Sequence, residues 1–388
     1  MIDLPPFRLE VFFSDWESYA KYNIAQSDAE TMTVDEILAM ATPDEREAFG
    51  AIRLSYPPAW GGDDLRAAVA ATYDTVDPDH VLCFSGAEEA IFWAMEDLIG
   101  PGDHAIVTVP NYQSMESVAI ATGADITPAV LDARNGWAFD LEDLRAQLRP
   151  TTRLIAVNFP NNPTGATPDE ATFRALVELC DERGIRLFSD EVYRGLEVEG
   201  SRPALPQAAD ISPTALSLNV MSKAYGLSGL RIGWIASQDR EVLAGLEKRK
   251  HFTSICNAGP SEHLATIALR NAEKVRARNR AIIAENVPLF REFFTERWGH
   301  LFDWEQPQGG CVSYPRYLGP DTADDFCHKL LIEAGVCVLP PRIYQSALAE
   351  LPGDRFRMGV GHRVGAAALE VFDDYLARTT ATTERQDG

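Results

Sequence analysis

The feature that most constrains the fold is an alternation, over much of residues 80–252, of short apolar runs with longer amphipathic stretches. The apolar runs are short, and several are rich in β-branched residues, which is typical of buried strands. The stretches between them have the length of helices. Strands that alternate with helices predict a mainly parallel sheet covered on both faces. The predicted strands are 104–110, 153–160, 185–191, 215–221 and 231–237, and the predicted helices include 88–99, 169–184 and 240–252.

The C-terminal third has a different pattern, in which a long charged helix is followed by short strands and further helices. We therefore predict an α/β protein with a three-layer large domain and a smaller α+β domain. The N-terminal residues are expected to complete the smaller domain. The expected division is residues 1–45 and 281–378 for the small domain, 46–280 for the large domain, and 379–388 for a disordered tail.

Composition excludes several classes of function. The formal net charge is −23, which disfavours binding to nucleic acid because phosphate backbones would be repelled. No stretch of eighteen apolar residues is present, so no membrane-spanning helix is expected. The six cysteines form no CxxC pair, and the N-terminus lacks the basic segment of a secretion signal. These features predict a cytoplasmic protein with reduced, mostly buried thiols.

Polar residues follow several of the predicted strands. Ligands of parallel sheets bind outside the carboxyl ends of the strands. In SLNVMSKAYGLSGLRIGW, residues 217–234, Lys223 is a single lysine among mostly small and apolar residues. A lysine whose pKa is lowered can act as a nucleophile or form a Schiff base. Lys223 is therefore a candidate catalytic residue if other strand ends supply partners for it.

Three candidate partners follow the neighbouring strands. Asp190 and Tyr193 stand in FSDEVY, and Asn162 stands in NFPNNPTG. Asp190 can pair with a buried cation, whereas Tyr193 and Asn162 can donate hydrogen bonds to an anionic oxygen. Each has a structural alternative when taken alone: a loop or capping aspartate, a half-buried tyrosine, and a turn that binds no ligand.

Two further segments are candidates for binding a phosphate. Ser85, Gly86 and Ala87 join a strand to a helix whose N-terminus can bind an anion, although a capped helix without an anion is the alternative. Arg231, in the glycine-rich GLRIGW, can bind a phosphate with two hydrogen bonds. Tyr112, in PNYQS, can cover one face of a flat ring or serve as a structural aromatic.

One ligand accounts for all of these segments. This ligand has an aldehyde that bonds to an amine and a ring nitrogen that pairs with an acid. It also has a ring oxygen that accepts hydrogen bonds from two donors, and a phosphate that binds to a helix N-terminus and an arginine. That ligand is pyridoxal 5′-phosphate. The residues assigned to these groups are Lys223 to the aldehyde, Asp190 to the ring nitrogen, Tyr193 and Asn162 to the ring oxygen, Tyr112 to the ring face, and Ser85, Gly86, Ala87 and Arg231 to the phosphate.

Together, these segments resemble the class I and II aminotransferases, which are fold type I enzymes related to aspartate aminotransferase. The resemblance covers about residues 45–375 and includes N-P-T-G, D-E-x-Y and S-K-x-x-x-x-x-G-x-R-x-G in order. It implies that Arg357 binds the substrate carboxylate, with help from Asn162. It also implies a homodimer in which Tyr56 reaches the phosphate of the neighbouring subunit.

The chain departs from the family pattern in two places. Val220 stands where a Ser or Thr often contacts the phosphate, and Ser222 is expected to compensate. The usual N-terminal glycine-proline motif is replaced by YNIAQSDAETMTVDEIL, residues 22–38. Asp28 and Glu30 in this stretch are interpreted as solvated loop acids, with attraction of a basic substrate side chain as the alternative. No histidine spacing indicates a metal site, so His362 is interpreted as structural or exposed.

The predicted function is an aminotransferase that moves an amino group between an L-amino acid and a 2-oxo acid through a Schiff base on Lys223. Asp190 and Tyr193 are the other predicted catalytic residues. A lyase or a cyclase of the capreomycidine-synthase type would use the same residues and stays open. A binding protein without catalysis and a nucleotide-binding enzyme are the remaining alternatives, and no GxGxxG or GxxxxGK[ST] motif supports the latter.

Overall fold

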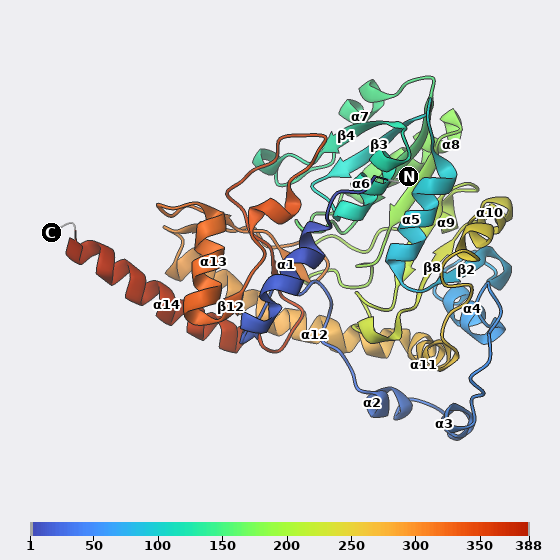
Figure 1. The fold of residues 1–388 in the computed structure, drawn as a ribbon, viewed down its shortest axis with the longest axis horizontal. Helices are drawn as coiled ribbons and strands as arrows, with labels where there is room; N and C mark the ends of the chain where they lie inside the picture. The colour runs from blue at the N-terminus through green and yellow to red at the C-terminus, as the bar shows by residue number, and fades with distance from the viewer. Residues whose placement is uncertain (1–2, 387–388) are drawn as a thin grey trace.

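A seven-stranded sheet forms the centre of the larger part of the computed structural model, which describes residues 3–386 (Figure 1). The strand order is β2-β8-β7-β6-β5-β3-β4, and β8 pairs antiparallel with both of its neighbours. The other pairings are parallel, so the predicted mainly parallel sheet is confirmed. The strands are β2 (Val81–Phe84), β3 (His104–Val109), β4 (Asp125–Val130), β5 (Thr152–Asn158), β6 (Arg186–Asp190), β7 (Leu216–Val220) and β8 (Gly233–Ala236).

Helices cover both faces of this sheet. Successive strand residues point to opposite faces, and on β3 Ala105 and Val107 join one apolar cluster whereas Ile106 joins another. Buried residues of α5, α6 and α10 belong to the first cluster, and those of α7 and α8 belong to the second. The helices of this part are α4 (Asp63–Ala70), α5 (Ala87–Leu98), α6 (Gln113–Ala121), α7 (Leu141–Gln147), α8 (Glu170–Arg183), α9 (Ala208–Ile211), α10 (Arg240–Lys250) and α11 (Gly259–Arg270).

The carboxyl ends of three neighbouring strands lie at one edge of the sheet. The register pairs Asn158 of β5 with Asp190 of β6, and Asp190 with Leu218 of β7. Lys223 follows the end of β7 after a short turn. This edge therefore gathers polar groups that are widely separated in the sequence.

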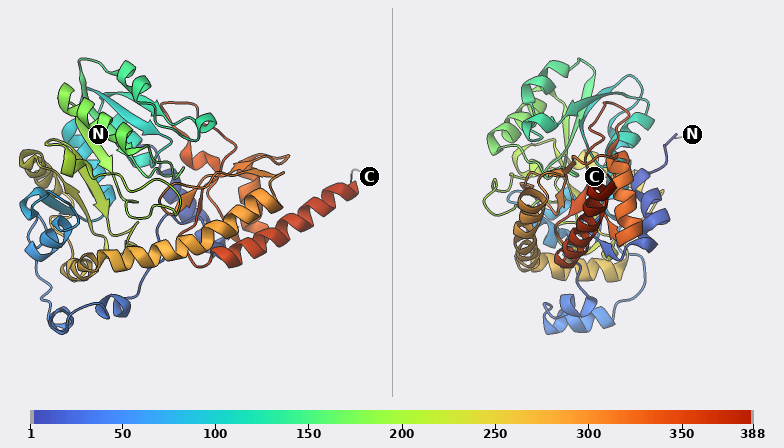
Figure 2. Two further views of the ribbon diagram at one scale, coloured as in Figure 1. Left: turned by 180° about the vertical axis from the view of Figure 1, so that it is seen from behind. Right: turned by 90° about the vertical axis from the view of Figure 1, so that its left-hand side faces the viewer.

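The smaller part combines the N-terminal segment with the C-terminal third. Strand β1 (Tyr22–Asn23) pairs parallel with β12 (Val336–Cys337). The long helix α12 (Ala272–Arg291) runs from the larger part to the smaller one (Figure 2). The expected domain boundaries at residues 46 and 281 remain a prediction. The remaining elements are α1 (Arg8–Trp16), α2 (Val34–Leu38), α3 (Pro43–Gly50), η5 (Glu292–Arg297), β9 (Phe302–Asp303), β10 (Val312–Ser313), β11 (Arg316–Tyr317), α13 (Ala323–Ala334), β13 (Met358–Gly359) and α14 (Gly365–Gln386).

Helix α14 continues to Gln386, and residues 387 and 388 lie outside the described part. The disorder expected for residues 379–388 remains a prediction. Within residues 3–386, none of the helices is both long enough and apolar enough to cross a membrane.

Candidate active site

A cavity of about 220 Å³ lies at the carboxyl edge of the sheet, and Glu10 of α1 lines its outer side. Figure 1 shows α1 lying between the two parts of the molecule. Asn158, Val192 and Val220 also line the cavity, together with most of the predicted site residues. The predicted residues in its wall are Ala87, Tyr112, Asn162, Asp190, Tyr193, Ser222, Lys223 and Arg231.

Lys223 has the surroundings that a reactive amine requires. Its Nζ donates a hydrogen bond to Ser27 Oγ at 2.8 Å. Burial lowers the pKa of Lys223, and the nearby charge of Arg357 lowers it further, against the opposing effect of Asp28. A lowered pKa increases the fraction of neutral amine, which is the nucleophilic form.

Asp190 is a buried carboxyl group at the end of β6. Its exposed fraction is 4%, and burial raises its pKa to about 7. The backbone N–H of Val192 donates to Asp190 Oδ1 at 3.2 Å and stabilises the ionised form. Within residues 3–386 no cation lies within ion-pair distance of Asp190, so its carboxylate is available to a cationic ligand group.

Tyr193 and Tyr112 contribute the aromatic part of the wall. The Tyr193 side chain is 1% exposed, and its hydroxyl has no hydrogen-bond partner among the described residues. Burial raises the pKa of Tyr193 well above its usual value, so the hydroxyl stays protonated and can donate. The ring of Tyr112 packs against Phe7 with the ring centroids 5.2 Å apart. A buried hydroxyl without a partner indicates that a ligand supplies one.

The N-terminus of α5 and Arg231 form a cradle suited to an anion. Gly86 caps α5 without a side-chain hydrogen bond and has a φ of +93°. A Cβ atom at Gly86 would collide with the Arg231 guanidinium. Arg231 Nη1 donates to the Ser228 carbonyl at 3.1 Å and lies 3.5 Å from Ser222 Oγ. No carboxylate in the described part pairs with Arg231, so its charge is free for an anionic ligand.

Three predicted cofactor residues do not line this cavity: Ser85, Gly86 and Tyr56. The backbone N–H of Ser85 donates to Glu89 Oε2 at 2.8 Å. Tyr56 is 85% exposed and lies in an irregular segment between α3 and α4. Gly86 is not in the wall itself, but it fixes the approach of Arg231 to α5.

Arg357 lies next to Asn162 and is almost fully buried. Its exposed fraction is 1%, and its Nη1 donates to Asn162 Oδ1 at 3.2 Å. Nη2 donates to the Ala25 carbonyl, and the guanidinium lies 5.7 Å from the centre of the Tyr344 ring. Nε has no hydrogen-bond partner in the described part. A buried guanidinium without a carboxylate is expected to bind an anion.

Sequence reasoning missed several residues at this site. Asn158 Oδ1 accepts from the Asn162 N–H at 2.7 Å, and its position at the end of β5 could have revealed it. No sequence pattern indicated Ser27, because its contact with Lys223 joins segments that are far apart in the sequence. The interpretation of Asp28 as a solvated loop acid is wrong. Its side chain is 20% exposed, and Oδ1 lies 3.1 Å from Nε2 of His362.

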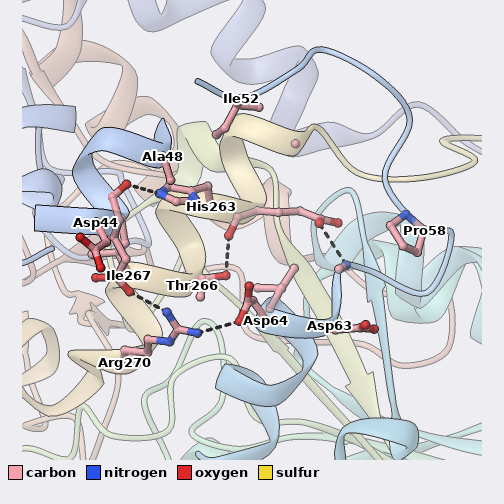
Figure 3. A pocket seen from close by; sticks show the side chains of 15 residues that line it. Asp44, Ala48, Ile52, Pro58, Asp63, Asp64, His263, Thr266, Ile267 and Arg270 are labelled. Carbon is pink, nitrogen blue, oxygen red and sulfur yellow. Dashed lines mark hydrogen bonds and ion pairs between the residues drawn. The ribbon is translucent and has the colours of Figure 1, made fainter. Parts of the chain in front are cut away.

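A second cavity, of about 630 Å³, lies between α3, α4 and α11 (Figure 3). Arg270 crosses it and pairs with Glu45 at 2.6 Å and with Asp64 at 2.9 Å. Gly62, in the segment that follows Tyr56, donates its N–H to Glu262 Oε2 at 3.0 Å. None of the predicted cofactor residues lines this cavity.

Comparison with known proteins gives consistent results over most of the chain. The family described as "Aminotransferase class I and II" matches residues 21–366. Capreomycidine synthase of Streptomyces vinaceus is 32% identical over 360 residues, which cover 92% of this chain and 89% of that protein.

Solved structures extend this likeness to the fold. A PLP-dependent aminotransferase from Streptococcus suis has 31% identity and a TM-score of 0.89, with 97% of this chain and 98% of that chain covered. The PLP-dependent cyclase OrfR has a TM-score of 0.85 over 95% of this chain and 97% of its own, and its 24% identity supports the fold alone. The chain therefore belongs to the class I and II aminotransferase family and has the fold type I architecture of pyridoxal 5′-phosphate enzymes.

Proposed function

We propose that the protein is an aminotransferase that moves an amino group between an L-amino acid and a 2-oxo acid. One observation carries this proposal: Lys223, Asp190 and Tyr193 line a single cavity, and beside it lies the buried Arg357, which has no carboxylate partner among the described residues. The family membership supports the same conclusion, because transamination is the activity that names the family.

The residues present fit pyridoxal 5′-phosphate. The unpartnered Tyr193 hydroxyl and Asn162 would hold the ring oxygen. Asp190 would pair with the ring nitrogen, and Arg231 with the N-terminus of α5 would hold the phosphate. Lys223 would supply the amine that bonds to the aldehyde. Each of these groups is buried or unpaired in the way that the matching part of the cofactor would satisfy.

The protein's own residues would perform binding and proton transfer. Arg357 would bind the substrate α-carboxylate and so orient the α-carbon. When bound, the cofactor accepts the electron pair left by the departing α-proton. Lys223 would act as the general base that takes this proton, since its lowered pKa favours the neutral amine. Asp190 would keep a proton at the ring nitrogen.

A cyclase or lyase is the second candidate function. It is favoured by the 32% identity to capreomycidine synthase over nearly the whole chain. The atypical segment of residues 22–38 also supports it, because Ser27 and Asp28 from this segment lie beside Lys223. Both functions would use the same cofactor and the same base, so the site residues alone do not separate them.

We further propose a homodimer. Leu54 and Tyr56 are 87% and 85% exposed in the segment before α4, and contact with a second chain would bury these two neighbouring side chains. In a dimer, Tyr56 would complete the phosphate site of the partner. The cytoplasmic location expected from the sequence stays a prediction.

Two measurements test this function. We expect Lys223→Ala to abolish the visible absorbance of the protein with pyridoxal 5′-phosphate and nearly all turnover, whereas the matched exposed variant Lys248→Ala keeps both. Mixing the holoenzyme with single amino acids then separates the candidates. A transaminase stops after the first half-reaction until an oxo acid is added, whereas a cyclase or lyase continues without it. An absorbance band that survives Lys223→Ala would refute the assignment.

A further inference from the structure

The N-terminal segment of residues 24–30 is held firmly between the C-terminal part of the chain and Lys223. Its backbone forms hydrogen bonds from Gly359 N to the Ile24 carbonyl (2.6 Å) and from Glu30 N to the Gly361 carbonyl (2.9 Å). Ala29 N donates to the carbonyl of Lys223 at 3.3 Å. These bonds fix Asp28 near the reactive amine, because Ser27 directly before it accepts the Nζ hydrogen bond.

The Asp28 carboxylate is oriented by a histidine that is itself held in place. His362 Nε2 lies 3.1 Å from Asp28 Oδ1, and His362 Nδ1 lies 3.5 Å from Glu30 Oε2. The side chain of Asp28 is 20% exposed, that of His362 is 13% exposed, and that of Glu30 is 27% exposed. The Asp28 carboxylate is therefore oriented through its Oδ1 atom.

The Asp28 carboxyl group is ionised in the folded protein. Burial raises the pKa of Asp28, but the hydrogen bond from His362 and the charge of Lys223 lower it by more. A largely buried, ionised carboxylate is stabilised by a cationic partner.

Arg357 and Asp28 carry opposite charges, and both lie close enough to Lys223 to shift its pKa, Asp28 upward and Arg357 downward. Arg357 is 1% exposed with an unpartnered Nε. We propose that Asp28 binds the cationic end of the substrate side chain, so that the substrate is an amino acid with a side-chain guanidinium or ammonium group. This inference rests on the proposed function, in which Arg357 binds the α-carboxylate.

The wild-type holoenzyme tests the proposal without any mutation. Arginine and citrulline have nearly the same shape but differ in side-chain charge, as do lysine and norleucine. We expect kcat/KM for one cationic member to exceed that of its neutral partner by about 10- to 100-fold. A larger ratio for arginine over citrulline would identify the preferred side-chain cation as a guanidinium, and a larger ratio for lysine over norleucine would identify it as an ammonium group. Calorimetry adds a binding measurement, with 5-guanidinopentanoate expected to bind more tightly than 5-ureidopentanoate by a similar factor.

Variants assign the discrimination to Asp28. Asp28→Asn is expected to reduce the cationic-to-neutral ratio of kcat/KM to near one. The ratio is the readout because loss of the Asp28 charge also alters the pKa of Lys223 and so affects turnover of both kinds of substrate. Asp35→Asn, on the exposed face of α2, changes the net charge equally and is expected to keep the ratio. Asp28→Glu retains the negative charge and is expected to keep part of the preference for cationic substrates. This variant tests the proposal if Asp28→Asn does not fold.

Two results would overturn the proposal. The first is a wild-type enzyme that holds the cofactor and turns over neutral amino acids as well as cationic ones, which would leave the proposed function intact. The second is loss of the preference in Glu10→Gln but not in Asp28→Asn, which would assign the cation to the carboxylate on α1. A protein without the visible absorbance band would instead refute the proposed function, and this inference with it.

Discussion

At the scale of single residues, the site is defined by buried polar groups that lack partners. Arg357 and Asp190 are 1% and 4% exposed without an ion pair in the described part of the chain, and Tyr193 has a buried hydroxyl without a hydrogen bond. Leaving such groups unpaired costs stability. They are maintained together because one ligand with matching charges satisfies all of them, which is why we interpret this cluster as functional.

Asp190 allows a test in the cofactor-free protein. An unfolded Asp ionises near pH 4, whereas the pKa of Asp190 in the folded protein is about 7. The contribution of Asp190 to stability is therefore fully present below about pH 4 and is lost as the pH rises towards 7. Asn cannot ionise, so we expect Asp190→Asn to be more stable than wild type at pH 8 by on the order of 2–4 kcal/mol.

The measurement is urea unfolding of both proteins at pH 8 and at pH 4.5. The difference should shrink at the lower pH. Glu191, whose pKa burial also raises to about 7, titrates in both proteins and cancels. The exposed Asp35→Asn serves as the control. Equal stabilities at pH 8 would show that Asp190 is not destabilised when charged. Cofactor affinity should change in the opposite direction and become weaker in Asp190→Asn.

Arg357 carries the prediction for substrate binding. Arg357→Ala should raise KM for the amino acid by about 100-fold, because a carboxylate loses a bidentate charged partner. The visible absorbance with cofactor should persist, since Arg357 does not line the cofactor cavity. Steady-state kinetics and absorption spectra check both parts, with the exposed Arg316→Ala as control. Unchanged KM would place the carboxylate elsewhere.

Sequence reasoning located the residues that follow strands but not those brought in from the ends of the chain. Asp190 and Lys223 could be predicted because strand ends in a parallel sheet share an edge. Ser27 and Asp28 could not, because their position depends on hydrogen bonds to residues more than 190 positions away in the sequence. Such contacts leave no local pattern, and His362 was interpreted as structural for the same reason.

At the scale of elements, the turn from β2 into α5 determines how an anion can be held. Gly86 adopts a φ of +93° and leaves no room for a Cβ atom beside Arg231. We expect Gly86→Ala to weaken binding of pyridoxal 5′-phosphate by about 10- to 100-fold and to lower the free energy of unfolding by about 1–2 kcal/mol. Equilibrium titration of the apoprotein measures the first effect, and urea unfolding measures the second.

Gly100 provides the matched control for this variant. A Cβ atom there would meet nothing within 4 Å, so Gly100→Ala should change neither quantity appreciably. A Gly86→Ala protein that binds the cofactor as tightly as wild type would show that the close approach of Arg231 to α5 is not required.

The elements that the sequence predicted well are those buried in the sheet. Most residues of β3, β5, β6 and β7 are buried. The sequence predicted each of these strands to within two residues of its ends. β4 was not predicted, because this edge strand is partly exposed and contains Pro128, so it lacks the apolar run of its neighbours.

At the scale of the whole molecule, the cofactor site is incomplete in one chain if Tyr56 has the proposed role. Tyr56 is 85% exposed and lies outside the cavity, in a segment that reaches the second cavity at Pro58 (Figure 3). An exposed tyrosine there contributes nothing to its own site. A symmetric dimer would bring it to the site of the partner.

Mixing two inactive variants tests this arrangement. Lys223→Ala lacks the base, and Tyr56→Ala lacks the residue proposed to act across the interface. If sites are shared, a mixed dimer contains one site with both native residues. Unfolding and refolding equal amounts together should therefore restore about a quarter of wild-type activity, because half of the dimers are mixed and each has one intact site. Each variant refolded alone is the control, and sedimentation confirms the dimer. Activity no higher than the sum of the two separate variants would mean that Tyr56 acts within its own chain.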